Sequence, residues 1–278
     1  MKRFKLIDLL DNVGINTFLI DAMGVIYNDK GLIPGAAAAI NKFKSIGKIF
    51  IVTNNTTNNP TQIAAKISRF GAKIEPVEVV SSGFGLAYDK KTNEMVKDKA
   101  VYVFGREDCY SYFERAKVRK IVYNLKDAEV VVLTATLEEG QEEFFADFKK
   151  ELANFSGLPI ICANPDIFVM SAPGVERAVI GYYAKILEEA GHTVHWIGKP
   201  FPNFLRVVGN ILNDRGISLG KDVCFFDDNV KNVLAMQEVL GISGCVVTDT
   251  GLSKYMDLET EFKLKTNRPD YLINSLTV

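Results

Sequence analysis

The sequence is poor in the features that mark secreted, membrane-spanning and nucleic-acid-binding proteins. It has only four cysteines and no CxxC pair, and three of the four lie in apolar runs, where cysteine behaves as a small buried hydrophobe. The 33 basic residues are balanced by 34 acidic ones, so there is no basic surplus for nucleic acid or an anionic membrane. No apolar run approaches the roughly 18 residues that a membrane helix needs. We therefore expect reduced thiols and a soluble, cytoplasmic protein that binds neither nucleic acid nor membranes.

Two further absences argue against common cofactor sites. The histidines, His192 and His195, lack ligand spacing with any carboxylate or cysteine, which favours surface or packing roles over metal binding. No Gly-x-Gly-x-x-Gly pattern follows an apolar run, so the sequence has no dinucleotide fingerprint. There is also no internal repeat and no low-complexity segment, and the length allows two modest domains or one large one.

What the sequence does contain is a recurring unit of a short apolar run, a few turn residues and a helical pattern. Residues 17–20 precede a helix expected near 34–46, and residues 49–52 precede one expected near 60–69. Further apolar runs are Ala100–Phe104, Glu129–Leu133, Pro159–Cys162, Val194–Ile197, Val223–Phe226 and Gly244–Val247. Continuous apolar runs suit strands buried on both faces, and their alternation with helices favours a parallel sheet. We therefore predict an α/β fold.

Polar residues lie at the ends of four of these runs. In open parallel sheets, ligands bind beyond the carboxyl ends of the strands. A single polar residue at such a point more often ends a strand or forms a turn, but four such positions together indicate a site. The residues are Asp21, Thr53–Asn54–Asn55, Lys199 and Asp227–Asp228.

Four motifs, in this order, resemble those of the haloacid-dehalogenase superfamily. They are Phe18-Leu-Ile-Asp21-Ala-Met-Gly24-Val, Ile51-Val-Thr53-Asn54-Asn55, Ile197-Gly-Lys199-Pro200 and Phe225-Phe-Asp227-Asp228-Asn-Val-Lys-Asn232. Their spacing is similar to that of the NagD-like branch of sugar-phosphate, phosphoglycolate and nitrophenyl-phosphate phosphatases, which inserts a large α/β cap between the second and third motifs. The stretches 32–35 and 163–166 and the tail from Arg268 fit the same branch, so the resemblance covers essentially the whole chain.

The resemblance implies a Rossmann-like parallel-sheet core with an inserted α/β cap domain. We expect the core to comprise residues 1–80 and 188–278 and the cap to comprise residues 81–187. A segment of this length is too long for a loop and is expected to be a domain of its own. Such a cap would close over the site, exclude water and contact the organic part of the substrate. The sequence leaves open whether the chain forms a homo-oligomer.

The same resemblance assigns the chemistry of phosphate-ester hydrolysis to the motif residues. Asp21 would attack phosphorus and form an aspartyl-phosphate. Mg²⁺ would compensate the charge of the carboxylate and the phosphate, and this ion prefers oxygen ligands. Its protein ligands would be Asp21, the backbone carbonyl of Met23 and Asp228. The implied partner is a small phosphorylated metabolite.

Other motif residues would bind the phosphate. Thr53 and the backbone amides of Asn54 and Asn55 would hold phosphate oxygens. Lys199 would add a positive charge to the phosphate and the nucleophile, and Gly24 would let the backbone pass close to the phosphate.

Three further residues would lie beside the metal-binding and phosphate-binding residues. Asp227 and Asn232 would orient the metal ligand and the lysine. Asp166, which follows the cap run 159–162, is equally consistent with a substrate contact and with a plain Asx turn.

Position 23 departs from the family's pattern. The family's phosphatases carry a second aspartate there, which protonates the leaving oxygen and then activates the water, whereas the thioether of Met23 cannot transfer a proton. Such assistance typically contributes ~10²–10⁴-fold in rate. Three interpretations stay open: a phosphatase that is slow or uses another acid, a regulator that binds a phosphorylated ligand without turnover, and an enzyme of a different reaction type. Against the dehalogenase branch of that last group, its chemistry needs no metal, whereas Asp228 is retained here.

Overall fold

Two parallel sheets organise the chain. The computed structural model describes residues 3–135, 142–172, 174–258, 260 and 267–277. The larger sheet has the order β1 (Arg3–Phe4), β16 (Tyr271–Ile273), β15 (Ser243–Val247), β14 (Val223–Asp227), β2 (Thr17–Ile20), β5 (Lys48–Thr53) and β6 (Val79–Ser81). The smaller sheet has the order β13 (Val194–Trp196), β10 (Ile160–Cys162), β9 (Val130–Leu133), β7 (Ala100–Phe104) and β8 (Lys120–Val122). All neighbouring strands in both sheets are parallel, which confirms the predicted α/β class.

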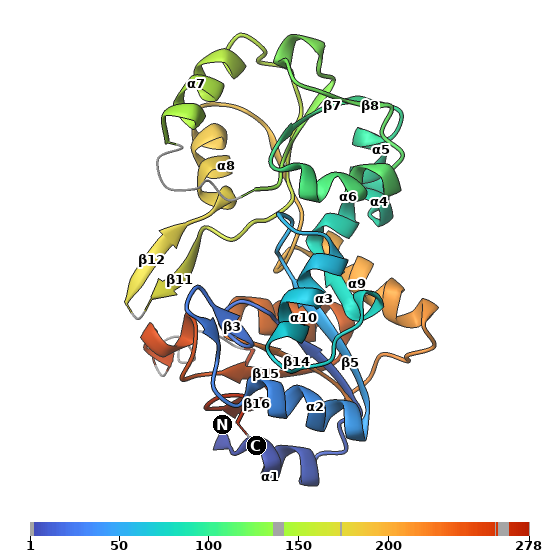
Figure 1. Cartoon of the computed structure of the whole chain (residues 1–278), viewed down its shortest axis with the longest axis vertical. Helices are drawn as coiled ribbons and strands as arrows, with labels where there is room; N and C mark the ends of the chain where they lie inside the picture. Colours follow the sequence, from blue (N-terminus) through green and yellow to red (C-terminus); the bar gives the residue numbers. More distant parts are fainter. Residues whose placement is uncertain (1–2, 136–141, 173, 259, 261–266, 278) are drawn as a thin grey trace.

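Helices alternate with the strands, as the sequence pattern predicts. They are α1 (Leu6–Asn12), α2 (Ala36–Ile46), α3 (Pro60–Arg69), α4 (Gly85–Tyr88), α5 (Lys90–Val96), α6 (Tyr110–Arg115), α7 (Glu142–Leu152), α8 (Ile180–Glu189), α9 (Pro202–Asp214) and α10 (Val230–Leu240). Two antiparallel hairpins complete the fold, β3 (Tyr27–Asn28) with β4 (Gly31–Leu32) and β11 (Phe168–Ala172) with β12 (Val175–Ala178). The two sheets lie in separate halves of an elongated molecule (Figure 1).

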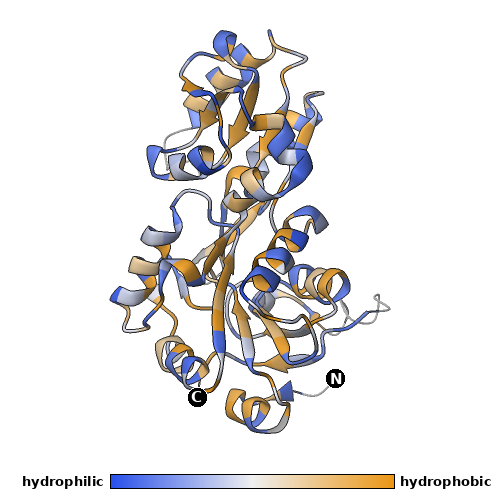
Figure 2. Ribbon diagram, turned by 90° about the vertical axis from the view of Figure 1, so that its right-hand side faces the viewer, coloured by the Kyte–Doolittle hydropathy of each residue, from blue (hydrophilic) through white to orange (hydrophobic). Residues whose placement is uncertain are grey.

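The larger sheet is buried on both faces, because successive side chains of a strand point to opposite faces. In β2, Leu19 belongs to a hydrophobic cluster with residues of α9 and α10, whereas Phe18 and Ile20 belong to a second cluster with residues of α1, α2 and α3. Phe18 stacks on Phe43 of α2 with ring centroids 4.4 Å apart. Figure 2 shows hydrophobic residues concentrated in the strands. This double burial explains the continuous apolar runs in the sequence.

The chain passes between the two halves after β6 and again after β13. The predicted core, residues 1–80 and 188–278, includes Val194–Trp196, but these residues form β13, which pairs in parallel with β10 and therefore lies in the smaller sheet. The apolar run was recognised correctly, yet its composition does not say which sheet it joins. The exact division into a core and a cap stays a proposal, with the second crossing near Ile197.

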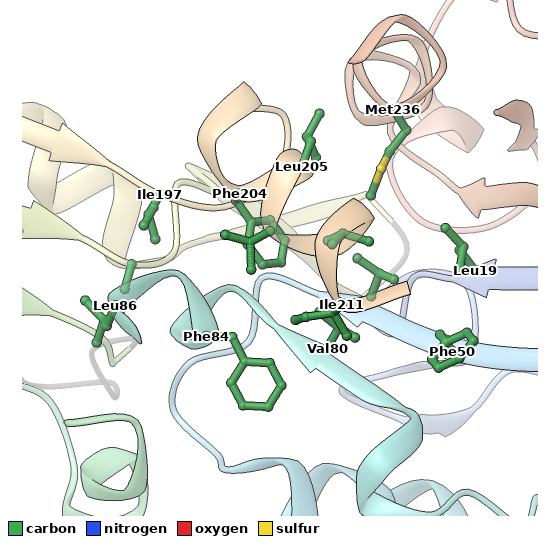
Figure 3. Packing of buried hydrophobic residues seen from close by; sticks show 14 of the residues in the cluster. Leu19, Phe50, Val80, Phe84, Leu86, Ile197, Phe204, Leu205, Ile211 and Met236 are labelled. Carbon is green, nitrogen blue, oxygen red and sulfur yellow. The ribbon is translucent and has the colours of Figure 1, made fainter. Parts of the chain in front are cut away.

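Hydrophobic packing continues across these crossings. Leu86 of α4 and Ile197 belong to the same buried cluster as Phe204 of α9 (Figure 3). A Cβ atom on Gly85 would collide with Ile197, so the two crossing segments are in close contact. The halves are therefore connected by packed side chains as well as by the chain itself.

Two expectations about the whole chain can be compared with the structure. The four cysteines are free and buried, whereas burial was predicted for the three that lie in apolar runs. Within the described part of the chain, no helix has the length and hydrophobicity needed to cross a membrane.

Candidate active site

The predicted site residues meet at one edge of the larger sheet. β14, β2 and β5 are neighbours and run parallel, so their carboxyl ends lie side by side. Asp21 follows β2 directly, while Thr53 and Asp227 are the last residues of β5 and β14. Residues that are far apart in the sequence thus come together at the point where an open parallel sheet binds its ligands.

Lys199 joins two of the carboxylates at this edge. Its side chain is 1% exposed, and its Nζ donates to Asp21 Oδ1 at 2.6 Å and to Asp227 Oδ2 at 2.8 Å. A third bond runs to the carbonyl of Val52 at 3.0 Å. Burial alone would lower the pKa of Lys199, but the two carboxylates outweigh it and raise the pKa above its usual range. The ammonium is therefore a fixed positive charge beside Asp21.

Asn54 holds the backbone that carries Lys199. Its Oδ1 accepts a hydrogen bond from the Lys199 N–H at 2.8 Å, and its Nδ2 donates to the Lys199 carbonyl at 3.0 Å. The same Nδ2 donates to Asp166 Oδ1 at 2.9 Å. The Asn54 side chain consequently positions the lysine and connects it to the loop that follows β10.

Three buried carboxylates face one another next to the lysine. One oxygen from each of Asp21, Asp227 and Asp228 lies within 4.8 Å of the others. Burial raises the pKa of Asp21 to about 7, with Lys199 opposing and Asp227 adding to the shift. Burial, followed by repulsion from Asp227 and Asp21, raises the pKa of Asp228 well above its usual range. A single ammonium does not balance three carboxylates, so this group could hold a divalent metal ion through oxygen ligands.

The side chain of Asp227 is held by residues at the start of α10 and by the lysine. Its Oδ1 accepts from the Asn229 N–H at 2.7 Å, and its Oδ2 accepts from Asn232 Nδ2 at 3.1 Å as well as from Lys199. These bonds leave Asp21 and Asp228 as the carboxylates with more freedom to bind an ion. The orienting role assigned to Asp227 and Asn232 from the sequence stays a prediction.

Asp228 is held by a loop that the sequence analysis did not identify. The Leu252 N–H donates to Asp228 Oδ2, and the Ser253 hydroxyl donates to the Asp228 carbonyl. Gly251 has a φ of +54°, and a Cβ atom there would collide with the Asp228 carboxylate. The sequence could have indicated this loop, because it follows the predicted strand 244–247 and so begins at the same edge of the sheet as the other site residues.

The loop after Asp21 is a tight turn around position 23. The Gly24 N–H donates to the Tyr27 carbonyl at 2.8 Å, and the Ile26 N–H donates to the Ala22 carbonyl at 2.9 Å. Gly24 has a φ of +89°, and a Cβ atom there would lie 2.6 Å from Asp228 Oδ2. The glycine is therefore needed for the close approach of this turn to Asp228. Met23 is half-buried, packs against the hydrophobic cluster of α1, α2 and α3, and lines the cavity beside Asp21.

A cavity of about 250 Å³ opens above these residues. Asp21, Thr53, Asn54, Asn55 and Lys199 lie in its wall, together with Asp227, Asp228 and Asn232. The Thr53 Oγ1 accepts a hydrogen bond from the Asn55 N–H at 3.2 Å, which shapes the loop after β5. All the candidate residues named from the sequence thus border one cavity, including Met23, Gly24 and Asp166.

The opposite wall of the cavity comes from the segment after β10. Phe168, Val169 and Met170 of β11 and Arg177 of β12 line it. The hairpin β11–β12 extends towards the β3–β4 hairpin (Figure 1), and Arg177 forms an ion pair with Asp29 at 3.1 Å. A substrate bound at Asp21 would therefore be enclosed from both halves of the molecule.

Asp166 lines the cavity where the segment after β10 meets the loop after β5. Its N–H donates to Asn164 Oδ1 at 3.1 Å, so Asn164 forms the Asx turn, while the Asp166 carboxylate accepts from Asn54. Burial raises the pKa of Asp166 to about 6, with Lys199 and the Asn54 hydrogen bond opposing the shift. Asp166 is thus a carboxyl group with an unusually high proton affinity in the wall of the cavity.

Comparison with known proteins gives a consistent picture. Residues 18–119 match the family model of haloacid dehalogenase-like hydrolases. The chain is 27% identical over 266 residues to a dihydroxyacetone phosphatase of Corynebacterium glutamicum, covering 94% of this chain and 89% of the relative.

Two solved structures share the fold. A protein from Cytophaga hutchinsonii described as a possible sugar phosphatase of the HAD superfamily aligns with a TM-score of 0.83 and 20% identity, covering 100% of this chain and 99% of its own. NagD from Escherichia coli aligns with a TM-score of 0.69 and 19% identity, covering 94% and 97% of the two chains. At these identities the two structures support the fold, including both sheets.

Proposed function

We propose that this chain, whose residues 18–119 match the family model of haloacid dehalogenase-like hydrolases, is a Mg²⁺-dependent phosphatase of small phosphate monoesters of the sugar-phosphate type. The single observation that carries this proposal is the arrangement of Asp21, Lys199 and Asp228 at the floor of one cavity. It combines a nucleophile, a fixed positive charge and a set of oxygen ligands. The full-length relative named a dihydroxyacetone phosphatase supports the same class of substrate.

Asp21 is the proposed nucleophile. One carboxylate oxygen would attack phosphorus, the ester P–O bond would break, and the alcohol would leave with a proton. Water would then attack the aspartyl-phosphate and release inorganic phosphate and the free Asp21 carboxylate. Lys199, 2.6 Å from Asp21 Oδ1, favours the ionised nucleophile and opposes the charge of the phosphoryl group.

Asp21, the carbonyl of Met23 and Asp228 would hold Mg²⁺. When bound there, the ion supplies positive charge that favours the ionised carboxylates and polarises the phosphoryl oxygens. The crowding of three buried carboxylates, which raises the pKa values of Asp21 and Asp228, is the property of this chain that fits such an ion. The Thr53 hydroxyl and the amides of Asn54 and Asn55 would bind the remaining phosphoryl oxygens.

The proton for the leaving alcohol must come from a residue other than Met23. We propose Asp166, which lines the same cavity and whose pKa of about 6 leaves part of it protonated near neutral pH. Because Asp166 follows β10 of the smaller sheet, its position relative to Asp21 depends on how the two halves of the molecule pack. Turnover would then be slower than in relatives that have an aspartate two residues after the nucleophile.

A regulator that binds a phosphorylated ligand without hydrolysing it is the second candidate. The packing of Met23 against the hydrophobic cluster favours this alternative, because it makes the turn beside Asp21 part of an apolar core. Both candidates predict binding of phosphate esters, and only the first predicts release of inorganic phosphate.

A panel of phosphate esters tests the proposal. Purified protein is assayed for phosphate release with Mg²⁺ and with a chelator, alongside Asp21→Asn and a control variant, Asp147→Asn, at an exposed position of α7. We expect release that requires both Mg²⁺ and Asp21 and that is unchanged in the control. Activity that survives in Asp21→Asn would refute the proposed nucleophile, and binding without release would establish the regulator instead.

A further inference from the structure

A second cavity lies between the two halves of the molecule, away from Asp21. Its volume is about 460 Å³. It is bordered by the start of α3, by Pro76 and Val77 of a 3₁₀ turn, by Phe84 and Tyr88, and by residues of α6 and the end of α9. Figure 1 shows α4 and α6 next to α3 and α9, where the two halves of the molecule meet. A ligand in this cavity would touch segments on both sides of the first crossing.

The cavity carries positive charge without acidic residues. Its described lining contains Arg115 and Arg215 but no aspartate or glutamate. Neither arginine forms an ion pair within the described part of the chain. The carboxyl end of α9 contributes roughly half a negative charge and the amino end of α3 roughly half a positive charge, so these two dipoles offset each other. The charges of both guanidinium groups are left to attract an anion.

Aromatic rings and neutral oxygens hold both guanidinium groups. The Cζ atom of Arg115 lies 5.1 Å from the ring centroid of Phe84, and its Nη1 donates to the Tyr88 hydroxyl at 2.8 Å. The Cζ atom of Arg215 lies 5.3 Å from the ring centroid of Phe50, and its Nη1 donates to the Val77 carbonyl. A guanidinium has five N–H donors, so these contacts orient the groups and leave donors for a ligand.

We propose that this cavity binds a phosphate-class anion, held by Arg115 and Arg215 together. Two guanidinium groups match a multiply charged phosphate in both charge and hydrogen-bond geometry. Arg115 is the last residue of α6, which lies in the half with the smaller sheet, whereas Arg215 directly follows α9, which packs on the larger sheet. The bound anion therefore ties the two halves together next to the first crossing. The ligand is a pyrophosphate or a phosphorylated metabolite of similar charge.

Binding can be measured separately from hydrolysis. Titration calorimetry with inorganic pyrophosphate is carried out in a chelator at low salt, so that no divalent ion at Asp21, Asp227 and Asp228 attracts the anion to the active site. We expect one site per chain in the wild type. Arg115→Gln and Arg215→Gln should each weaken binding about ten-fold or more, since each removes charge-assisted hydrogen bonds.

Arg206→Gln is the matched control, because Arg206 is an exposed residue of the same helix α9 and does not line the cavity. It should bind pyrophosphate like the wild type. Arg115 is also exposed, so its variant is expected to fold, which circular dichroism would verify. A tungstate soak of crystals, with anomalous scattering, should place the anion between the two arginines. Equal pyrophosphate affinity in all four proteins, or a tungstate peak only beside Lys199, would overturn the inference. The inference does not depend on the hydrolytic activity.

Discussion

Replacement of Met23 by aspartate tests most directly how this site moves protons. Met23 lines the cavity next to Asp21, and its side chain is half-buried, so a carboxylate there would face the same space as Asp21. The shorter side chain leaves room beside the phosphoryl position. The turn itself is held by backbone hydrogen bonds of Gly24 and Ile26, which the substitution does not remove. We therefore expect Met23→Asp to fold and to bind Mg²⁺.

The expected increase in kcat depends on the general acids that the site already contains. A well-placed general acid contributes ~10²–10⁴-fold in rate. The proposed acid Asp166, with a pKa of about 6, would supply part of this assistance in the wild type, so only a fraction of the range is available. We expect kcat on alkyl phosphates to rise by at least about ten-fold, which corresponds to roughly 1.4 kcal/mol of transition-state stabilisation. Nitrophenyl phosphate should gain much less, because its phenolate leaves without a proton.

Met23→Asn is the control, since it has the shape of aspartate but no transferable proton. Phosphate release is followed over a series of esters with leaving groups of different pKa, at saturating Mg²⁺. The dependence of kcat on the leaving-group pKa should become shallower in Met23→Asp and stay steep in Met23→Asn. If Met23→Asp folds, binds Mg²⁺ and is no faster than Met23→Asn on any ester, the missing-acid explanation is wrong.

Two further substitutions test the charges around Asp21. Asp228→Asn should raise the thermal stability of the metal-free protein, because it removes one of three crowded carboxylates. It should also weaken both Mg²⁺ binding, measured by calorimetry, and hydrolysis, measured by phosphate release. A variant that binds Mg²⁺ as tightly as the wild type would contradict the ligand assignment. Lys199→Met should lower the free energy of unfolding in chelator by about 3–5 kcal/mol, since it leaves Asp21 and Asp227 without their buried partner. Chemical denaturation measures this loss, and a change below about 1 kcal/mol would show that the buried ion pairs contribute little.

The strands and the edge of the sheet that carries the site were predictable from local patterns. β2, β7 and α3 begin and end at the predicted residues, because double burial requires continuous apolar runs and because turn residues end them. Asp21, Thr53 and Asp227 could be placed together because the carboxyl ends of parallel strands share one edge. These are properties of short segments, which composition and order encode directly.

Contacts between distant segments needed the tertiary structure. The sequence did not indicate that β13 joins the smaller sheet, because an apolar run records burial and not the identity of its neighbour. It also did not indicate that Asn54 would hold Lys199, that the Leu252 N–H would contact Asp228, or that Arg177 would pair with Asp29.

The sequence by itself thus determined the α/β class, the strands and the residue types at their ends. The tertiary structure decided which side chains share hydrogen bonds and which carboxylates repel one another. The physical reason is that pKa values and ion binding depend on distances of a few ångströms between groups. Residues such as Asn54 and Lys199 reach those distances only when the loops that follow β5 and β13 pack together.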